Sequence, residues 1–334
     1  MVYVITVIFS FLFLKLFSFI KTPLLSDIPN ERSMHTTPVK RSAGIVFFCL
    51  FWMINLYKCW ENDGFFHDFY FFFCSTVFFA FLGFFDDIKN LSSKLKLLLE
   101  IIFIIIILSI YPKAFSIFTF DFSNYSVISI TILTLYIVFI SNLCNFMDGL
   151  DLYLSFTYIF FIINYFIFNN FTFNNYSNIL LILFFSMSSF FYFNSPNAKM
   201  FMGDSGSLPI GLLIGISPLF SEVDGISSDL SFIIFFIPIF IIDGVFTLIK
   251  RTIEKKHIFR AHREHLYQRV QIELEWGKWK TLLIFTLLNV IPSSFYFLFR
   301  EFGYGKLGIV ISLILITLTY IRIFLLCNQK VKDN

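Results

Sequence analysis

The stretch that decides the fold is "FFHDFYFFFCSTVFFAFLGFFDDIKN", residues 65–90. Residues 65–85 are predominantly apolar, and about 20 such residues let a helix cross the ~30 Å hydrocarbon core of a bilayer. Two adjacent carboxylates, Asp86 and Asp87, end this run. Because neighbouring like charges repel unless a cation or a shared proton relieves them, the pair predicts more than an ordinary helix end.

The composition predicts an all-α polytopic membrane protein. Of the 334 residues, 57% are hydrophobic and 14% are charged, whereas a soluble domain carries about 25% charged residues and would have to bury this apolar surface. The five cysteines show no metal-ligand spacing and fall mostly in apolar runs, so we expect buried thiols and no disulfides.

Apolar segments of spanning length recur along the chain and predict a bundle of about 10–11 transmembrane helices in a single domain, 1–334. We expect these helices at 2–20, 43–57, 65–85, 96–111, 125–141, 152–169, 177–193, 208–220, 230–249, 281–299 and 305–326. The first segment has no basic residues before it and no small-residue cleavage site after it, so we expect a span there and not a signal peptide.

The positive charges predict the orientation of these helices. With the N-terminus outside, the C-terminal tail is cytoplasmic, and so are the loops 21–42, 86–95, 142–151, 194–207 and 250–280. These segments hold most of the 25 Lys and Arg residues, whereas the opposite loops hold Lys58, Lys113, Arg300 and Lys306. The positive-inside rule selects this orientation, and every motif-like polar stretch then falls on the cytoplasmic side.

The first such stretch is "DDIKNLSSKLK", residues 86–96, where the aspartate pair is followed by Lys94 and Lys96. A solvated connector between two helices would also carry charges. A simple connector seldom places paired aspartates directly at the membrane boundary.

A second stretch, "SNLCNFMDGLD" (141–151), spaces Asn142, Asn145, Asp148 and Asp151 by three. On a helix these side chains would sweep one half of the surface. Polar groups at the end of a span are costly unless they face a cavity or partners. A helix that frays into a loop explains the Asn and Gly residues but not the regular spacing.

The stretch "FMGDSGSLPIG" (201–211) places glycines around Asp204. Ser207 as N-cap and Pro209 in the first turn predict a helix start, whose free N–H groups suit a phosphate. Asp204 would repel that phosphate unless a divalent cation lay between them. A lone glycine-rich turn is by itself a weak signal.

The stretch "HIFRAHREHLYQR" (257–269) supplies three arginines and His257, His262 and His265. The spacing of His262 and His265 would put both on one helical face. The alternative is an ordinary basic loop attracted to anionic lipid head groups. Zinc is disfavoured, because no further ligand of the right type stands at close spacing.

Together these stretches place five carboxylates on one membrane face: Asp86, Asp87, Asp148, Asp151 and Asp204. Hard oxygen ligands suit Mg²⁺, with Mn²⁺ as the alternative, and the Lys and Arg residues of the same face suit phosphate oxygens. This combination indicates phosphoryl transfer, which needs positioning and charge neutralisation.

Six motifs also carry a family resemblance, in order along the chain. They are "DIPNERSMHTTPVKRSAG" (27–44), "GFFDDIKNLSSKLK" (83–96), "NLCNFMDGLD" (142–151), "NAKMFMGDSGS" (197–207), "PIFIIDGVFTLIKR" (238–251) and "AHREHLYQR" (261–269). The chain resembles the polyprenyl-phosphate N-acetylhexosamine-1-phosphate transferases, glycosyltransferase family 4. These bacterial enzymes start the lipid intermediates of O-antigen, enterobacterial common antigen and peptidoglycan.

The resemblance implies a Mg²⁺-dependent phosphoglycosyltransferase of the bacterial inner membrane. Such an enzyme moves a sugar 1-phosphate from a UDP-N-acetylhexosamine, or a deoxy derivative, to undecaprenyl phosphate and releases UMP. Direct attack and a phospho-aspartate intermediate both remain open. No nucleic-acid partner is expected, and both a monomer and a homodimer are compatible with the resemblance.

The resemblance also implies roles for single residues. Asp204 and Asp87 are expected as metal ligands. Asp86 is expected as the base for the lipid phosphate, and Lys96 as the basic residue that holds this phosphate. Asp148 is expected as a further catalytic residue. The expected substrate-binding residues are Asn142, Asn145, Asp151, Phe201, Arg251, His262 and His265, with the ring of Phe201 against uracil.

Two features depart from the family pattern. The family often has Gly where Leu152 stands, after "DGLD". The histidine loop "AHREHLYQ" lacks the triple-His run of the peptidoglycan enzyme and is similar to the branch that acts on UDP-N-acetylglucosamine or on varied UDP-N-acetylated deoxysugars.

Two other classes of protein fit these features less well. A transporter of an anionic or nucleotide-linked solute would place ionisable residues near the bilayer midplane, often in paired repeats. Here the carboxylates stand at span ends, on one side, without a repeat. An assembly protein with docking loops would not need five aspartates facing one membrane surface.

Overall fold

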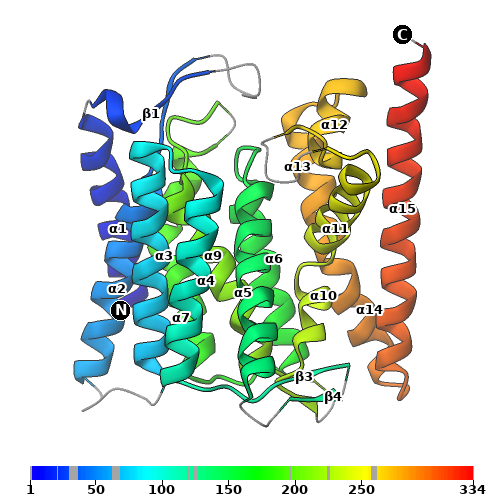
Figure 1. Ribbon diagram of the computed structural model, residues 1–334, viewed down its shortest axis with the longest axis horizontal. Coiled ribbons are helices and arrows are strands. Elements are labelled where there is room, and N and C mark those ends of the chain that lie inside the picture. The colour runs from blue at the N-terminus through cyan, green and yellow to red at the C-terminus, as the bar shows by residue number, and fades with distance from the viewer. Residues whose placement is uncertain are drawn as a thin grey trace. The chain divides into compact units, whose positions relative to one another are not determined.

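The computed structural model describes residues 2–20, 22–29, 37–61, 68–118, 120–122, 126–195, 197–223, 226–256 and 262–333. Helices dominate these ranges, and the only sheets within them are three short antiparallel strand pairs (Figure 1). The predicted all-α class is therefore confirmed. His257 and Arg260 of the predicted basic loop, and segment 30–36 of the first motif, lie outside the described residues.

The chain forms two compact units. The first comprises Met1–Phe146 and Thr172–Ser231, and the second comprises Met147–Phe171 and Phe232–Asn334. Each unit buries its own apolar core, and each holds part of the predicted site residues. The two units are therefore described separately.

The first unit is built mainly of helices. They are α1 (Val2–Phe19), α2 (Ala43–Glu61), α3 (Phe69–Lys89), α4 (Ser93–Ile110), α5 (Val127–Met147), α7 (Asn175–Met187), α8 (Phe190–Phe193) and α9 (Asp204–Ile216), with the 3₁₀ turns η1 (Pro23–Leu25) and η2 (Ser217–Phe220). The strand pairs are β1 (Ser26–Asp27) with β2 (Val39–Lys40), β3 (Ser116–Ile117) with β4 (Phe120–Asp121), and β5 (Glu222–Val223) with β6 (Ile226–Ser227).

Helix α9 lies at the centre of the first unit, and all its residues after Asp204 are buried. It packs against α3 and α2. A Cβ added to Gly83 of α3 would overlap the backbone of Asp204, and one added to Gly44 of α2 would overlap the backbone of Gly206. Small residues let helices approach closely in lipid, where no hydrophobic effect drives them together. These two glycines therefore set how closely α9 is packed.

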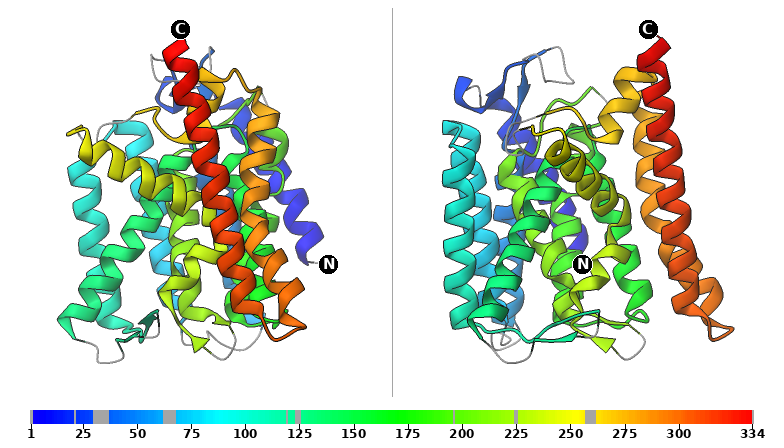
Figure 2. Two further views of the ribbon diagram at one scale, coloured as in Figure 1. Left: turned by 90° about the vertical axis from the view of Figure 1, so that its right-hand side faces the viewer. Right: turned by 45° about the vertical axis from the view of Figure 1, so that its right-hand side comes forward.

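The second unit contains α6 (Tyr153–Phe168), α10 (Ile233–Phe236), α11 (Pro238–Ile253), α12 (Leu266–Glu273), α13 (Lys278–Leu287), α14 (Ile291–Arg300) and α15 (Gly305–Asp333), with the 3₁₀ turns η3 (Leu230–Phe232), which starts in the first unit, and η4 (Leu288–Val290). The chain bends by 106° between Phe236 and Pro238, where proline supplies no N–H to continue the helix. Helix α15 packs antiparallel to α14 (Figures 1 and 2).

Six helical stretches of the described chain are long and apolar enough to cross a membrane, and the bent pair would make a seventh. The six are Val2–Phe19, Ala43–Glu61, Phe69–Lys89, Val127–Met147, Lys278–Arg300 and Gly305–Val331. The other predicted spans coincide with the shorter apolar helices Tyr153–Phe168, Asn175–Met187 and Asp204–Phe220, and with α4, which carries Lys94, Lys96 and Glu100. The predicted polytopic membrane protein is confirmed.

We expect Gly83→Ala to destabilise the first unit by about 1–3 kcal/mol, because the added methyl group would force α3 and α9 apart. Thermal unfolding of the purified protein in detergent would measure this loss. Gly277→Ala is the control, because nothing lies within 4 Å of a Cβ added there. Equal melting temperatures for the two variants would contradict the close packing of α3 on α9.

Candidate active site

The predicted site residues of the first unit lie largely on helix ends and not in loops. Helix α3 continues through Asp86 and Asp87 to Lys89. Asn90 then adopts the left-handed conformation (φ 49°) and donates its backbone N–H to the Asp86 carbonyl oxygen at 2.8 Å. Asparagine tolerates this conformation and commonly ends helices. The loop predicted for 86–95 is therefore shorter, and the aspartates stand on a rigid element.

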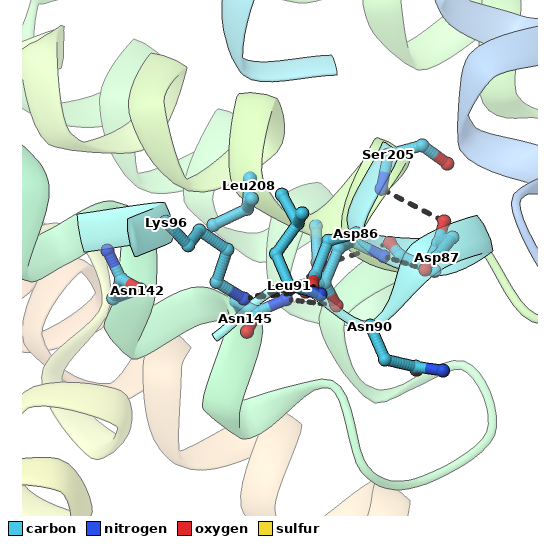
Figure 3. Close-up of polar contacts among 12 residues, drawn as sticks. Asp86, Asp87, Asn90, Leu91, Lys96, Asn142, Asn145, Ser205 and Leu208 are labelled. Atoms are coloured by element: carbon cyan, nitrogen blue, oxygen red, sulfur yellow. Dashed lines mark hydrogen bonds and ion pairs between the residues drawn. The ribbon is translucent and has the colours of Figure 1, made fainter. Parts of the chain in front are cut away.

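Asp87 caps the start of α9. Its carboxylate accepts the backbone N–H of Asp204 at 3.0 Å and that of Ser205 at 3.3 Å, and the Ser42 hydroxyl donates to it at 2.8 Å (Figure 3). The residue is only 4% exposed. A carboxylate in this place satisfies N–H groups that a helix start leaves free, and the helix dipole favours its charge.

The helix start predicted at Ser207 was wrong. Helix α9 begins at Asp204, with Gly203 (φ 69°) before it, so Pro209 lies inside the helix and not in its first turn. The N–H groups of Gly206 and Ser207 donate to the Gly203 carbonyl oxygen, both at 3.0 Å. The backbone N–H groups of Asp204 and Ser205 donate to the buried carboxylate of Asp87. The N–H groups predicted to hold a phosphate are thus already bonded within the chain.

Lys96, in the first turn of α4, joins two carboxylates from different helices. Its Nζ lies 3.0 Å from Asp86 Oδ2 and 2.6 Å from Asp204 Oδ2, and Figure 3 shows it extended toward Asp86. The Asn145 amide donates to Asp204 Oδ1 at 2.9 Å and to Ser207 Oγ at 2.8 Å. Helices α3, α4, α5 and α9 therefore meet at one cluster, in which the Lys96 ammonium pairs with the carboxylates of Asp86 and Asp204.

Asn142 binds a residue that the sequence analysis missed. Its amide donates to the Glu100 carboxylate and, at 3.0 Å, to the Val138 carbonyl oxygen. Glu100 is fully buried, and its second carboxylate oxygen has no hydrogen-bond partner within the described chain. The signal was a charged residue inside the predicted span 96–111, because ionisable groups in spans are costly and usually functional.

Asp148 and Asp151 belong to the second unit. The prediction that they continue a helical row of polar residues was wrong, because α5 ends at Met147. Asp148 is half-buried, and Asp151 is buried and forms an ion pair with Lys278 Nζ at 2.7 Å. The chain then turns at Leu152, which adopts the left-handed conformation (φ 64°) that explains a preference for Gly at this place.

His262 and His265 lie side by side, as their spacing predicted, but not on a helix. Their ring centroids are 5.0 Å apart, whereas α12 begins only at Leu266. The His265 ring stacks on Tyr267 with centroids 6.0 Å apart, and its Nδ1 lies 3.7 Å from a carboxylate oxygen of Asp243. The predicted proximity is confirmed and the predicted helical face is wrong.

Asp243 is a second residue that the sequence analysis missed. It is fully buried in α11 and accepts the Leu266 backbone N–H at 3.0 Å, the Tyr320 hydroxyl at 3.1 Å and the Thr247 hydroxyl at 3.2 Å. The residue therefore joins α11, α12 and α15. Its signal was again a carboxylate inside a predicted span, 230–249.

The remaining predicted residues are Arg251 and Phe201. In the second unit, Arg251 is buried and its guanidinium lies 3.1 Å from the Glu264 carboxylate, which also binds Lys256 at 2.9 Å. In the first unit, Phe201 is half-buried, and its backbone N–H donates to the Lys40 carbonyl oxygen at 2.7 Å. Both are held by contacts within their own unit.

Comparison with known proteins finds similarity to one family. The family model for glycosyl transferase family 4 matches residues 69–222. Over this segment the chain is similar to glycosyl transferase family 4. The matched segment runs from α3 to α9 and holds Asp86, Lys96 and Asp204, so the cluster lies inside the part that defines the family. The resemblance seen in the motifs is thereby confirmed.

Individual proteins with known names are also similar to the chain. The chain is 28% identical to the probable undecaprenyl-phosphate N-acetylglucosaminyl 1-phosphate transferase of Bacillus subtilis, over 75% of this chain and 72% of the relative. It is 28% identical to the undecaprenyl-phosphate alpha-N-acetylglucosaminyl 1-phosphate transferase of Thermotoga maritima, over 84% of this chain and 85% of the relative. It is 27% identical to the phospho-N-acetylmuramoyl-pentapeptide-transferase of Thermotoga neapolitana, over 46% of this chain and 48% of the relative.

We expect Asp87→Ala to destabilise the first unit by at least ~2 kcal/mol, because it leaves two backbone N–H groups and a hydroxyl without their buried acceptor. Asp204→Ala leaves the Asp87 cap in place, and Lys96 keeps its ion pair with Asp86. We therefore expect Asp204→Ala to reduce the free energy of unfolding by less than Asp87→Ala does. Thermal unfolding in detergent without substrates compares the two variants. Equal destabilisation would argue against the capping role of Asp87.

We expect the His262 ring to be neutral at physiological pH. Burial, together with the neighbouring His265 and Arg251, lowers the pKa of His262 from 6.5 to about 4. Because the unfolded chain binds the extra proton below about pH 6.5, the stability that neutral His262 provides is present above that pH and is lost as the pH falls toward 4.

Histidine NMR signals would measure this pKa, with His262→Gln to assign the resonance. The wild type should also lose more stability than His262→Gln between about pH 7 and pH 5. A folded-state pKa near 6.5 for His262 would show that burial does not control its charge.

Proposed function

We propose that this protein transfers an N-acetylhexosamine 1-phosphate from a UDP-sugar to undecaprenyl phosphate in the bacterial inner membrane and releases UMP. The product would be the first lipid-linked intermediate of a cell-surface polysaccharide. Support comes from the family and from the relatives of B. subtilis and T. maritima, whose names give undecaprenyl phosphate and an N-acetylglucosaminyl 1-phosphate.

The observation that carries the proposal is the cluster in which Lys96 lies between Asp86 and Asp204. Phosphoryl transfer depends on positioning and charge neutralisation more than on covalent chemistry. An ammonium binds phosphate oxygens, and a carboxylate can hold a divalent cation or accept a proton. Three helix ends supply these groups at one place in the first unit.

We propose Mg²⁺, with Mn²⁺ as the alternative, as the cation of this site. Two carboxylates share a single ammonium, so the cluster retains negative charge that suits a cation. Among the described residues, no group of three or more His, Cys, Asp or Glu could hold a metal. Mg²⁺ usually takes one or two carboxylates from the protein and completes its shell with water and substrate phosphates.

Asp204 would hold the cation, with water and the phosphates of the donor as its other ligands. When bound, the cation would neutralise the diphosphate of the donor. Asp87 was also predicted as a ligand. Its carboxylate is directed at the start of α9 and at Ser42. We therefore propose that Asp87 positions Asp204 and does not itself complete the metal site.

In the proposed reaction, an oxygen of the lipid phosphate forms a bond to the β-phosphorus of the UDP-sugar. The bond from that phosphorus to the UMP oxygen breaks, and UMP leaves. Lys96 would hold the lipid phosphate, because an ammonium has three N–H donors and the two carboxylates occupy two of them. Asp86 would accept the proton of a singly protonated lipid phosphate.

In the second unit, Asp148 is proposed as a catalytic residue, and Asp151 and Arg251 as substrate-binding residues. His262 and His265 are proposed to contact the sugar and the diphosphate. A neutral imidazole both donates and accepts a hydrogen bond, which suits sugar hydroxyl groups. These assignments rest on the motifs.

The orientation proposed from the positive charges places the N-terminus outside and the site on the cytoplasmic side. The UDP-sugar would enter from the cytoplasm, and the lipid phosphate from the bilayer. The transporter alternative gains no support, because the relatives are named as transferases and the carboxylates of the Lys96 cluster stand at helix ends.

We expect the purified protein in detergent to release UMP when given undecaprenyl phosphate, Mg²⁺ and one of a panel of UDP-N-acetylhexosamines. A lipid-linked diphosphate sugar should appear in equal amount. EDTA should stop the reaction and added Mg²⁺ should restore it. Asp204→Asn should lower the rate of UMP release about 10²–10³-fold. Lys94→Gln should retain the wild-type rate, because Lys94 is an exposed residue of α4.

An Asp204→Asn variant that remains fully active with Mg²⁺ would contradict the metal assignment. No UMP release from any donor, together with binding of UDP-sugars and their flux through proteoliposomes, would instead indicate a transporter.

A further inference from the structure

A basic cluster lies in the first unit, at the C-terminal end of α1. A cavity of 430 Å³ opens there between α1, α8 and the segments around Lys40 and Met200, and it shares no lining residue with the cluster around Lys96. Its basic lining residues are Lys15, Lys40 and Lys199, and its aromatic lining residues are Phe11, Phe19, Tyr192 and Phe193. The cavity thus combines cations with aromatic walls.

The positive charge of this cavity is not neutralised by carboxylates of the described chain. None of the residues that line it is acidic, and the ion pairs between described residues include none of its three lysines. The Lys199 ammonium lies 5.3 Å from the centroid of the Tyr192 ring, a contact that leaves its charge in place. The cavity therefore suits an anion.

Lys40 removes the main obstacle to an anion at this position. Its ammonium donates to the carbonyl oxygens of Phe17 and Ile20, the latter at 2.6 Å, at the end of α1. The carbonyl end of a helix carries partial negative charge and would repel an anion. With Lys40 on these carbonyls, the helix end is neutralised.

One face of α1 beside the cavity is apolar and exposed. Ile8, Leu12, Leu16 and Phe19 are 55%, 46%, 63% and 69% exposed, and their spacing of three and four residues puts them in one row along the helix. Phe19 belongs both to this row and to the cavity wall. Because α1 is long and apolar enough to span a membrane, lipid chains can lie along this row.

We propose that the cavity of Lys15, Lys40 and Lys199 binds the phosphodiester head group of an anionic phospholipid, whose acyl chains lie along the exposed row of α1. Basic pockets between helices near the membrane surface bind such head groups. A free phosphate would use the lysines but gain nothing from the apolar row. The lipid is therefore the ligand that uses both halves of the surface.

Such a lipid would hold together segments that are distant in sequence. Lys199 continues into Met200, which pairs with Lys40 in a β-bridge, and the Lys40 carbonyl oxygen accepts the Phe201 N–H at 2.7 Å. Binding at the cavity should therefore stabilise the folded first unit, since a ligand that binds only the folded state raises the melting temperature.

We expect dioleoyl phosphatidylglycerol to raise the melting temperature of the delipidated protein in a nonionic detergent, and dioleoyl phosphatidylcholine or inorganic phosphate to leave it unchanged. Native mass spectrometry would count the bound lipid. Lys15→Gln and Lys199→Gln should each weaken phosphatidylglycerol binding about fivefold, and the double variant about 25-fold. Lys40 is left intact because it caps α1.

Lys94→Gln is the matched control. It removes one exposed lysine from the same unit outside the cavity, so lipid binding should not change. Equal stabilisation by the two phospholipids, or unchanged phosphatidylglycerol binding in the double variant, would overturn the proposal. Equal stabilisation by inorganic phosphate would overturn the assignment to a lipid. None of these measurements depends on transferase activity.

Discussion

A buried carboxylate at the start of another helix is the interaction on which both units depend. Asp87 of α3 caps α9, and Asp243 of α11 binds the first N–H of α12. An unpaired N–H is especially costly where water is scarce, and burying a carboxylate is costly unless hydrogen bonds or a nearby positive charge offset its lost hydration. Asp87 therefore fixes the start of α9 against α3, and Asp243 fixes the start of α12 against α11.

This interaction explains why the apolar run 65–85 ends in two aspartates. Successive residues of a helix point about 100° apart, so Asp86 and Asp87 need not face the same partner. Asp87 meets backbone N–H groups, while Asp86 meets the ammonium of Lys96. The repulsion between them is relieved by two different positive partners. One carboxylate holds the helix that presents Asp204, and the other joins Asp204 in the cluster.

Other buried polar groups extend the same arrangement. Glu100 lies one helical turn after Lys96 on α4 and binds Asn142 of α5, so α4 reaches toward α5 as well as toward α3 and α9. Close helix packing is possible because Gly83 and Gly44 leave room for the backbone of α9. The cluster is thus positioned by helices in contact, which gives it less freedom than loops would allow.

The sequence alone determined the membrane class, the apolar segments and the residue types of the site, because hydrophobicity and motif order are properties of the chain itself. It predicted a helix at 65–85 where α3 runs from Phe69 to Lys89. Only the tertiary structure decided that Asp87 is a helix cap, that α9 starts at Asp204 and that Asp243 organises the second unit. These outcomes depend on hydrogen bonds between residues far apart in the chain, and local spacing carries no information about which distant N–H group a carboxylate will meet.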